Sequence, residues 1–347
     1  MLKYFLRRMA ILIPTLMGVT VVVFVIINMA PGGPIEQRLQ QIRFAGGDGS
    51  TGHSANGGGG RGASQGVSDE VLAALKKQYG FDKPMHERYF LWLKNIATLN
   101  FGESFTYEEP VLDVIVSKFP VSLQFGIISL ILSYLISIPL GIMKAIHHGS
   151  FFDVSSSVVL FIFYSIPSFM LAILLIVFLS GGSFFEIFPV GGLHSEIYDE
   201  LSNWEKFLDR IHHFTLPLIC YTIGSFTSLT VLMKNSLIEE IKKDYIRTAR
   251  AKGVSEKVVY MKHALRNALI PIVTGLGGFL TVFFAGSLLL ETIFQLDGIG
   301  LLSYKSILSR DYNVIMGLVF IQSALFLLGN VLSDFAYVLV DPRIDFT

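Results

Sequence analysis

Side chains that could carry out enzyme chemistry are sparse in this sequence. The eight histidines are scattered apart from two adjacent pairs, His147 with His148 and His212 with His213. No His-Glu-x-x-His zinc motif occurs, and no Walker A loop, since no glycine is followed by lysine. Both histidine pairs flank apolar segments, where an amphipathic ring suits a membrane interface, and a metal site there would need further ligands that the sequence does not identify. We therefore predict that the chain is not an enzyme and binds no metal or cofactor.

The densest cluster of positive charge, 244–253 (DYIRTARAKG), lies between two long apolar runs. Residues 245–252 favour a helix, Gly253 supplies a left-handed stop at its C-terminus, and the Ser-Glu pair at 255–256 can start another helix. We therefore predict two short helices joined by a tight turn. The apolar residue that follows the glycine is expected to contact Ala249.

A narrow face of small side chains is expected on the first of these helices. Ile246, Ala249 and Gly253 fall at positions i, i+3 and i+7. Arg247 and Arg250 flank this face, and positive side chains suit an acidic partner or the C-terminal ends of helices. Such a face would let the backbone of another protein approach closely. The alternative is that the loop only keeps its charge on the cytoplasmic side and lies on anionic lipid.

The composition indicates a membrane protein. Charged residues make up 16% of the chain and apolar residues 52%, whereas a soluble domain carries about a quarter charged residues. Six stretches are long enough to cross a hydrocarbon core of about 30 Å as helices. The first follows Lys3, Arg7 and Arg8 as a signal peptide would, but its apolar run is too long for one, so we predict an uncleaved span. The predicted spans are 9–30, 121–143, 154–180, 214–233, 269–290 and 313–340.

The distribution of basic residues predicts the orientation, because Lys and Arg are retained on the cytoplasmic side. The net charge is zero, but the loops differ: 234–266 holds nine basic and four acidic residues, whereas 181–213 holds two basic and six acidic residues. The amino-terminal tail adds three basic residues. We therefore predict that both termini face the cytoplasm.

The longest segment outside the spans, 31–120, is then external. Within it, 46–66 is rich in glycine and has almost no apolar side chains, so a disordered linker is expected. A helix is predicted over 68–80, from its Ser N-cap and Gly stop, and an amphipathic helix from 86 onward. These helices either form a cap on the external side or only cover the ends of the spans. The expected divisions are 1–30 (first span), 31–120 (external region), 121–341 (five-helix core) and 342–347 (cytoplasmic tail).

The spans provide a route through the membrane without an evident source of energy. Ion-driven carriers usually need ionisable groups within the bilayer, but the first five spans contain none between their ends, and Asp334 in the sixth lies near its cytoplasmic end. Cys220, the only cysteine, permits no internal disulfide and is expected to be buried between helices.

The run RTARAKG, continued by VSEKVVYMKHALRNALIP, resembles the cytoplasmic EAA loop of ATP-binding-cassette importer permeases of the dipeptide and oligopeptide branch. The family's Glu-Ala-Ala corresponds to Arg247, Thr248 and Ala249, so the acidic residue is absent, and its later Ile-x-Leu-Pro is replaced at 263–266. Ala249 and Gly253 are therefore the safest matching positions. Further similar stretches are MAPGGP, YGFDKP, RYFLWL, NFGESF, HHFTLPL and DFAYVLVDPRID.

The resemblance implies an all-α permease of the type I importer fold, with six transmembrane helices, in a bacterial inner membrane. Its implied partners are two ATPase subunits that receive the EAA loop, a second homologous permease, an external solute-binding protein, lipid and a peptide substrate, with no nucleic acid. GSLLLETIFQLDGIGLLSY and DPRIDF further resemble the branch for microcin C and peptide uptake. The candidate coupling residues are Ile246, Arg247, Thr248, Ala249, Arg250 and Gly253.

Two other classes of function stay open at the level of the sequence. The chain could be an ion-coupled carrier or channel that acts alone, or a membrane-bound receptor or scaffold. Under the favoured reading, small-residue faces such as GLGG at 275–278 and AGS at 285–287 allow close helix packing against a second permease. They can equally be ordinary span residues.

Overall fold

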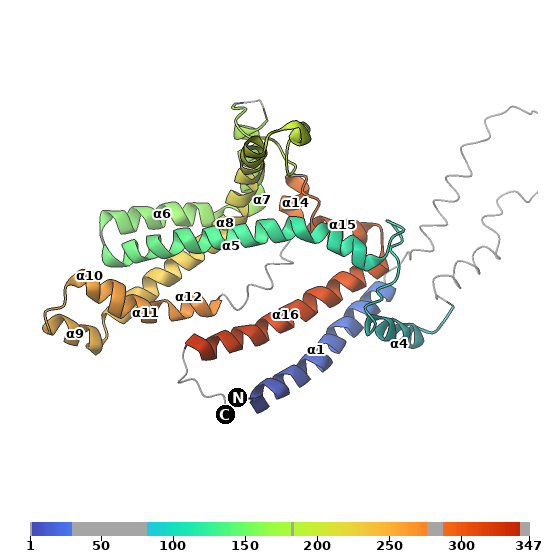
Figure 1. Cartoon of the computed structure of the whole chain (residues 1–347), viewed down its shortest axis with the longest axis horizontal. Coiled ribbons are helices and arrows are strands. Elements are labelled where there is room, and N and C mark those ends of the chain that lie inside the picture. The colour runs from blue at the N-terminus through green and yellow to red at the C-terminus, as the bar shows by residue number, and fades with distance from the viewer. Residues whose placement is uncertain (1, 30–81, 182–183, 276–286, 341–347) are drawn as a thin grey trace, which may run out of the picture. The chain divides into compact units, whose positions relative to one another are not determined.

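The computed structural model of the protein describes residues 2–29, 82–181, 184–275 and 287–340 (Figure 1). These residues form helices and loops, and within them the only strand-like pairing is a single bridge between Glu103 and Pro110. The predicted all-α class is therefore confirmed. The helices are α1 (Leu2–Met29), α4 (Met85–Ile96), α5 (Val111–Ile146), α6 (Phe151–Ser165), α7 (Ser168–Leu179), α8 (Asn203–Ile241), α9 (Asp244–Ala251), α10 (Glu256–Val258), α11 (Leu265–Ala268), α12 (Ile270–Gly275), α14 (Leu288–Ile293), α15 (Ile299–Leu308) and α16 (Tyr312–Val340), with a short 3-10 helix at Tyr198–Glu200 and a π-helical turn at Val259–Ala264.

Five of the six predicted spans correspond to apolar helices. Within the described residues, four helices are long and apolar enough to cross a membrane, and α6 with α7 qualifies as a further, bent span. The remaining prediction, 269–290, includes 276–286 and so lies partly outside the described residues, together with most of GLGG and AGS. The count of six therefore stays a prediction. The glycine-rich linker at 46–66 and the helix expected at 68–80 also lie outside the described residues.

The span expected at 154–180 is not one straight helix. Its two halves, α6 and α7, meet at an angle of 96°. The break lies at Pro167, which has no backbone N–H and disfavours helical geometry in the residue before it. Ile166 accordingly has extended angles, with φ −86° and ψ 121°. A proline inside the apolar run therefore ends one helix and starts another.

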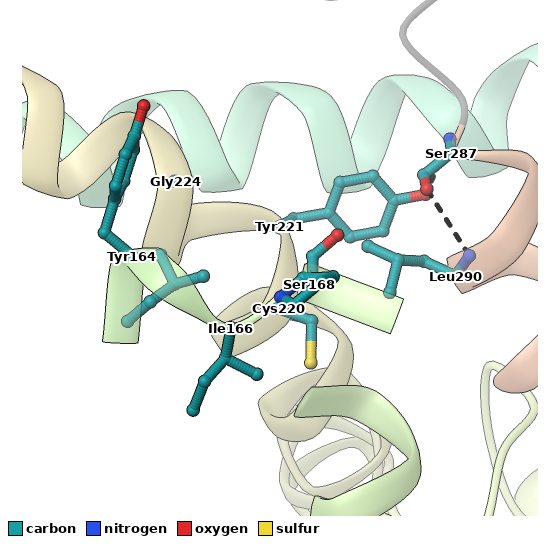
Figure 2. Close-up of a pocket in the computed structure, with 10 residues that line it drawn as sticks. Tyr164, Ile166, Ser168, Cys220, Tyr221, Gly224, Ser287 and Leu290 are labelled. Atoms are coloured by element: carbon teal, nitrogen blue, oxygen red, sulfur yellow. Dashed lines mark hydrogen bonds between the residues drawn. The ribbon is translucent and has the colours of Figure 1, made fainter. Parts of the chain in front are cut away.

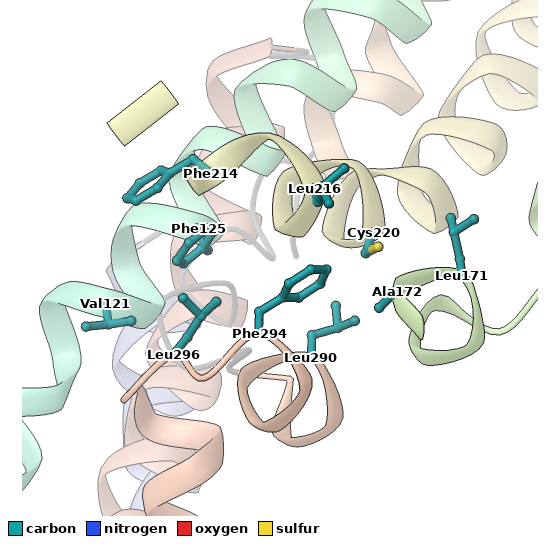
Figure 3. Close-up of a cluster of buried hydrophobic side chains, with 10 residues drawn as sticks. All are labelled: Val121, Phe125, Leu171, Ala172, Phe214, Leu216, Cys220, Leu290, Phe294 and Leu296. Carbon is teal, nitrogen blue, oxygen red and sulfur yellow. The ribbon is translucent and has the colours of Figure 1, made fainter. Parts of the chain in front are cut away.

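The chain divides into two compact units. One consists of Met1–Leu12, Ser117–Leu302 and Gln322–Thr347, and the other of Ile13–Val116 and Ser303–Ile321. In the first unit, a core cluster joins α5, α7, α8 and α14 (Figure 3). Phe125 and Phe214 lie with ring centroids 4.6 Å apart, and the predicted burial of Cys220 is confirmed at 2% exposure.

Close packing of α5 against α8 depends on a small residue and on hydroxyl groups. A Cβ added to Gly141 would lie 2.6 Å from the Cβ of Met233, so only glycine fits there. Ser133 and Ser225 are hydrogen-bonded at 2.9 Å, and Ser137 donates to the carbonyl of Phe226 at 2.9 Å. Small residues and interhelical hydrogen bonds of this kind hold helices together in lipid.

In the second unit, α4 packs against α1, and the helix expected from residue 86 onward is confirmed. The rings of Tyr89 and Phe24 pack edge to face at 5.3 Å, and the Tyr89 hydroxyl is hydrogen-bonded to Thr20 at 2.9 Å. Phe90, on the other face of α4, is 63% exposed. Through Tyr89, α4 covers one side of α1, and the choice between an external cap and a cover for the ends of the spans stays open.

Candidate functional site

The loop with the densest positive charge is built as predicted around a left-handed glycine. Helix α9 follows the end of α8 and stops at Gly253, whose φ is +77°. The amide of Gly253 donates to Arg250 O at 2.9 Å, and that of Val254 to Ala249 O at 3.3 Å. This pair of bonds is the Schellman arrangement that closes a helix. The second helical segment begins at Glu256, as the Ser-Glu pair predicted.

Of the three residues expected to form a docking face on α9, Ile246 is turned inward, Ala249 is half-buried and Gly253 is exposed. Ile246 therefore cannot contact a docked protein directly, while docking through this loop stays a prediction. Ile246 is fully buried, at 0% exposure, in a cluster with Met233 and Leu237 of α8. Ala249 and Val254 pack against the same cluster. The reason is the hydrophobic effect: Ile246 is the one large aliphatic side chain of α9, so it fixes which face points to the core.

The outward face of α9 is polar and short. Asp244, Arg247, Thr248 and Ala251 are all exposed, and their spacing of i, i+3, i+4 and i+7 places them on one stripe. The Arg247 guanidinium lies 3.4 Å from the Asp244 carboxylate, and the Thr248 hydroxyl donates to the Asp244 carbonyl at 3.0 Å. This stripe offers a cation, an anion and two small side chains to a partner.

Arg250, which was predicted to lie beside the small-residue face, is bonded to Glu256 within the same loop. Its Nε donates to Glu256 Oε1 at 2.8 Å and its Nη2 to Oε2 at 3.1 Å, and its guanidinium lies over the Tyr260 ring at 5.8 Å. The hydrogen bonds from Arg250 lower the pKa of the Glu256 carboxyl below its ordinary value. Arg250 therefore braces α9 against the following helix.

A second brace ties α9 to both of its neighbours. Glu240, near the end of α8, accepts a hydrogen bond from the Tyr245 hydroxyl at 2.6 Å and is paired with Lys243. Asn267 of α11 donates to the same Tyr245 hydroxyl at 3.0 Å. The Glu240 contacts fix α9 to the end of α8, beyond which it lies in Figure 1, and the Arg250 contacts fix it to the segment that follows.

A cluster of charged residues beside this loop was missed by the sequence analysis. Asp153 of α6 lies 2.7 Å from the ammonium of Lys234 and 3.2 Å from that of Lys144. Lys144 is fully buried and also donates to the hydroxyls of Ser156 and Ser157. Lys144, Asp153 and Lys234 each lie next to the end of a predicted span. This shared position was the signal in the sequence that could have indicated their contact. Their contacts bring the loop at 144–153 together with the start of the segment 234–266.

Comparison with known proteins agrees with the resemblance. Residues 137–346 match the family described as "Binding-protein-dependent transport system inner membrane component". The "Peptidoglycan transport system permease protein YejB" of Agrobacterium fabrum is 46% identical over 99% of this chain and 98% of its own length. The "Oligopeptide transport system permease protein AppB" of Bacillus subtilis is 33% identical over the whole of both chains, and the "Dipeptide transport system permease protein DppB" of Escherichia coli is 31% identical over 99% of each. The chain therefore belongs to the family of inner membrane components of binding-protein-dependent transport systems.

Proposed function

We propose that this chain is the translocation subunit of an importer driven by separate ATPase subunits, and that the cargo is a peptide or a peptide-like compound. The chain itself would catalyse no chemical reaction. One observation carries the proposal: Tyr245 ties α9 to Glu240 at the end of α8, Arg250 ties it to Glu256 in the following helix, and a polar face of α9 is turned outward. A braced helix of this kind can pass movement from a docked protein to a membrane helix.

The proposed docking surface is the outer stripe of α9. Thr248 and Ala251 have little bulk, so the walls of a groove on a partner can approach the helix backbone. Arg247 and Asp244 lie beside them and supply charges of both signs for hydrogen bonds across the interface. Ile246 and Ala249, by contrast, act from within, because they hold the stripe at a fixed angle to α8.

Movement of α9 would reach the other membrane helices through α8. The Glu240 carboxylate links the end of α8 to Tyr245 in α9, and Lys234 links α8 to Asp153 in α6. An ATPase that binds the stripe differently in its open and closed states would bias two arrangements of these helices. Differential contact of this kind is what allows one protein to drive another between states.

The proposed complex contains further subunits and has a defined orientation in the membrane. Two ATPases would dock from the cytoplasm, on the side that also holds both termini. A second, homologous permease would complete the pathway, and a solute-binding protein would deliver cargo from the external side. The excess of basic residues at 234–266 supports this orientation.

The cargo class is supported by the relatives, two of which are named for oligopeptide and dipeptide transport and one for peptidoglycan transport. Microcin C is a candidate within the peptide class. It rests on the resemblance of residues 286–304 and 341–346 to the branch that takes up this compound.

The test is to add bulk to the outer stripe. In vesicles that contain the chain, its ATPases, the second permease and the solute-binding protein, Ala251→Trp should lower ATP-driven peptide uptake at least tenfold and weaken ATPase copurification. Ala251→Ser is the matched control and should behave as the wild type. Ala249→Trp is less suitable, because Ala249 packs in the core and bulk there would disturb the loop itself. Normal uptake by Ala251→Trp would refute the docking surface, and uptake by the purified chain alone under an ion gradient would favour the carrier alternative.

A further inference from the structure

The bend between α6 and α7 opens onto a cavity of about 360 Å³ within the first unit (Figure 2). Its walls come from the end of α6, the start of α7, the middle of α8 and the start of α14. In Figure 2, Tyr164 stands at one end of the space and Ser287 and Leu290 at the other, with the ring of Tyr221 beside Ser168 between them. The cavity thus lies where a predicted span is broken.

The depth of the helix break within the membrane indicates that the cavity beside it holds water. Helix α6 has 15 residues, so at a rise of 1.5 Å per residue the break lies about 22 Å from its first residue. That is within a hydrocarbon core of about 30 Å if α6 starts at its cytoplasmic boundary. Pro167 precedes α7, and no side chain caps the first turn of this helix. Irregular backbone at membrane depth is tolerated only where protein buries it or where it lines a space filled with water. The cavity supplies that space.

The chemistry of the walls is neutral and mixed. None of the ten lining residues carries a charge at neutral pH, and the hydroxyls of Ser168, Ser287 and Tyr221 lie beside apolar groups such as Leu290. The Tyr221 hydroxyl already accepts a hydrogen bond from the Ser287 amide at 3.2 Å, which fixes its ring. Hydroxyl groups can both donate and accept, so these walls suit amide N–H and C=O groups and do not select a charged side chain.

We propose that this cavity is a subsite of the peptide pathway, in which the walls contact the uncharged main chain of the cargo. This inference rests on the proposed function. If the hydroxyls of Ser168, Tyr164 and Tyr221 form hydrogen bonds with main-chain amides, the site admits peptides with many different side chains. It also explains why a proline stands in the middle of an apolar run: the break exposes a polar wall that a continuous helix would close.

Gly224 permits a direct test, because it lines the cavity and a Cβ built on it meets no atom within 4 Å. Gly224→Leu would therefore place its Cβ in open space and add bulk to the cavity. In vesicles with the complete complex, we expect ATP-driven uptake of labelled alanine peptides of two to five residues to fall at least tenfold. Gly18→Leu in α1 is the matched control, since a Cβ there also meets nothing, and its uptake should stay within twofold of the wild type. Uptake by Gly224→Leu within twofold of the wild type would overturn the proposal.

If the Gly224→Leu variant does not assemble into the complex, the accessibility of a cysteine in the cavity tests the proposed subsite. Cys220 is the only cysteine, so Ser168→Cys in a Cys220→Ala chain carries a single thiol in the cavity. A charged methanethiosulfonate reagent should modify this thiol, and the same alanine peptides should slow the reaction at least fivefold during turnover. Leu135→Cys, at a side chain 65% exposed among apolar neighbours, is the control and should react slowly. A Ser168→Cys thiol as slow as the control, or one that peptides leave unaffected, would refute the subsite. Absence of ATP-driven uptake by the wild-type complex would instead refute the proposed function.

Discussion

A substitution of Gly253 tests how much its left-handed backbone matters for the stability of the turn between α9 and α10. Its φ is +77°, and a Cβ added to it meets no atom within 4 Å. Any penalty for a larger residue is therefore backbone strain and not a steric clash with neighbours. For an L-residue that strain is about 1–2 kcal/mol. Gly253→Val should destabilise the closed turn by this amount, which changes the ratio of open to closed turn by a factor of about 5 to 30.

Hydrogen exchange measured by mass spectrometry is the appropriate assay, because the turn is closed by amide hydrogen bonds. The amide of Val254 donates to Ala249 O at 3.3 Å and closes the motif. If opening of the turn limits exchange, amides of α9 should exchange about 5- to 30-fold faster in Gly253→Val. Coupled ATP-driven uptake should fall in parallel, since the outer stripe of α9 would lose its fixed orientation.

Two controls separate strain from other effects. Gly253→Asn should exchange more slowly than Gly253→Val, because asparagine adopts left-handed angles more readily. Gly18→Ala should leave α9 unchanged, since Gly18 lies in α1, has the same open surroundings and no positive φ. If Gly253→Val exchanged at the wild-type rate, or if the asparagine and valine variants were equally impaired, the strain argument would be refuted.

Two further predictions concern the charged groups of this region. Asp153→Asn leaves the fully buried Lys144 without its anion, which should lower the free energy of unfolding by about 3–5 kcal/mol, as measured by denaturant unfolding in detergent. Lys234→Met should be milder because that side chain is 16% exposed, and equal stability of Asp153→Asn and the wild type would contradict the account. Arg250→Gln should weaken the protection of α9 at neutral pH but not in acid. Arg250 lowers the pKa of Glu256 in the folded protein, so its stabilisation is present above about 4.3, the pKa of an unperturbed glutamate, and is lost as the pH falls through the lowered value. A difference between the variant and the wild type that persisted at the lowest pH would show that the ion pair is not its cause.

Local signals in the sequence were enough for five of the predicted spans and for the turn at Gly253. Most spans were found because about 20 apolar residues in a row have few other structures available to them in lipid. Gly253 was found because a glycine after a run of helix-forming residues is the usual way to end a helix. In each case, the decisive interactions involve residues close together in the chain.

Features that depend on distant residues were not predictable in the same way. The inward turn of α9 is decided by Ile246 meeting Met233 of α8, and the small-residue pattern alone favoured the opposite orientation. In the cluster around Asp153, the ion pair with Lys234 joins residues 81 positions apart. The bend at Pro167 had a local signal, but its hydrophobic surroundings resemble those of an unbroken span.

Under the proposed function, movement of α9 would tilt helix α8 about a point close to the cavity. Pro217 removes a backbone hydrogen bond and so marks the natural pivot within this helix. Ile241 lies about 36 Å beyond it by helical rise, whereas Gly224 lies only about 10 Å away. A shift of about 2 Å at the end that carries α9 corresponds to a tilt of about 3° and moves Gly224 by only about 0.6 Å. Under the proposed function, the end of α8 that carries α9 would therefore move several times further than Gly224, so the α8 wall of the cavity would keep almost the same position around the cargo.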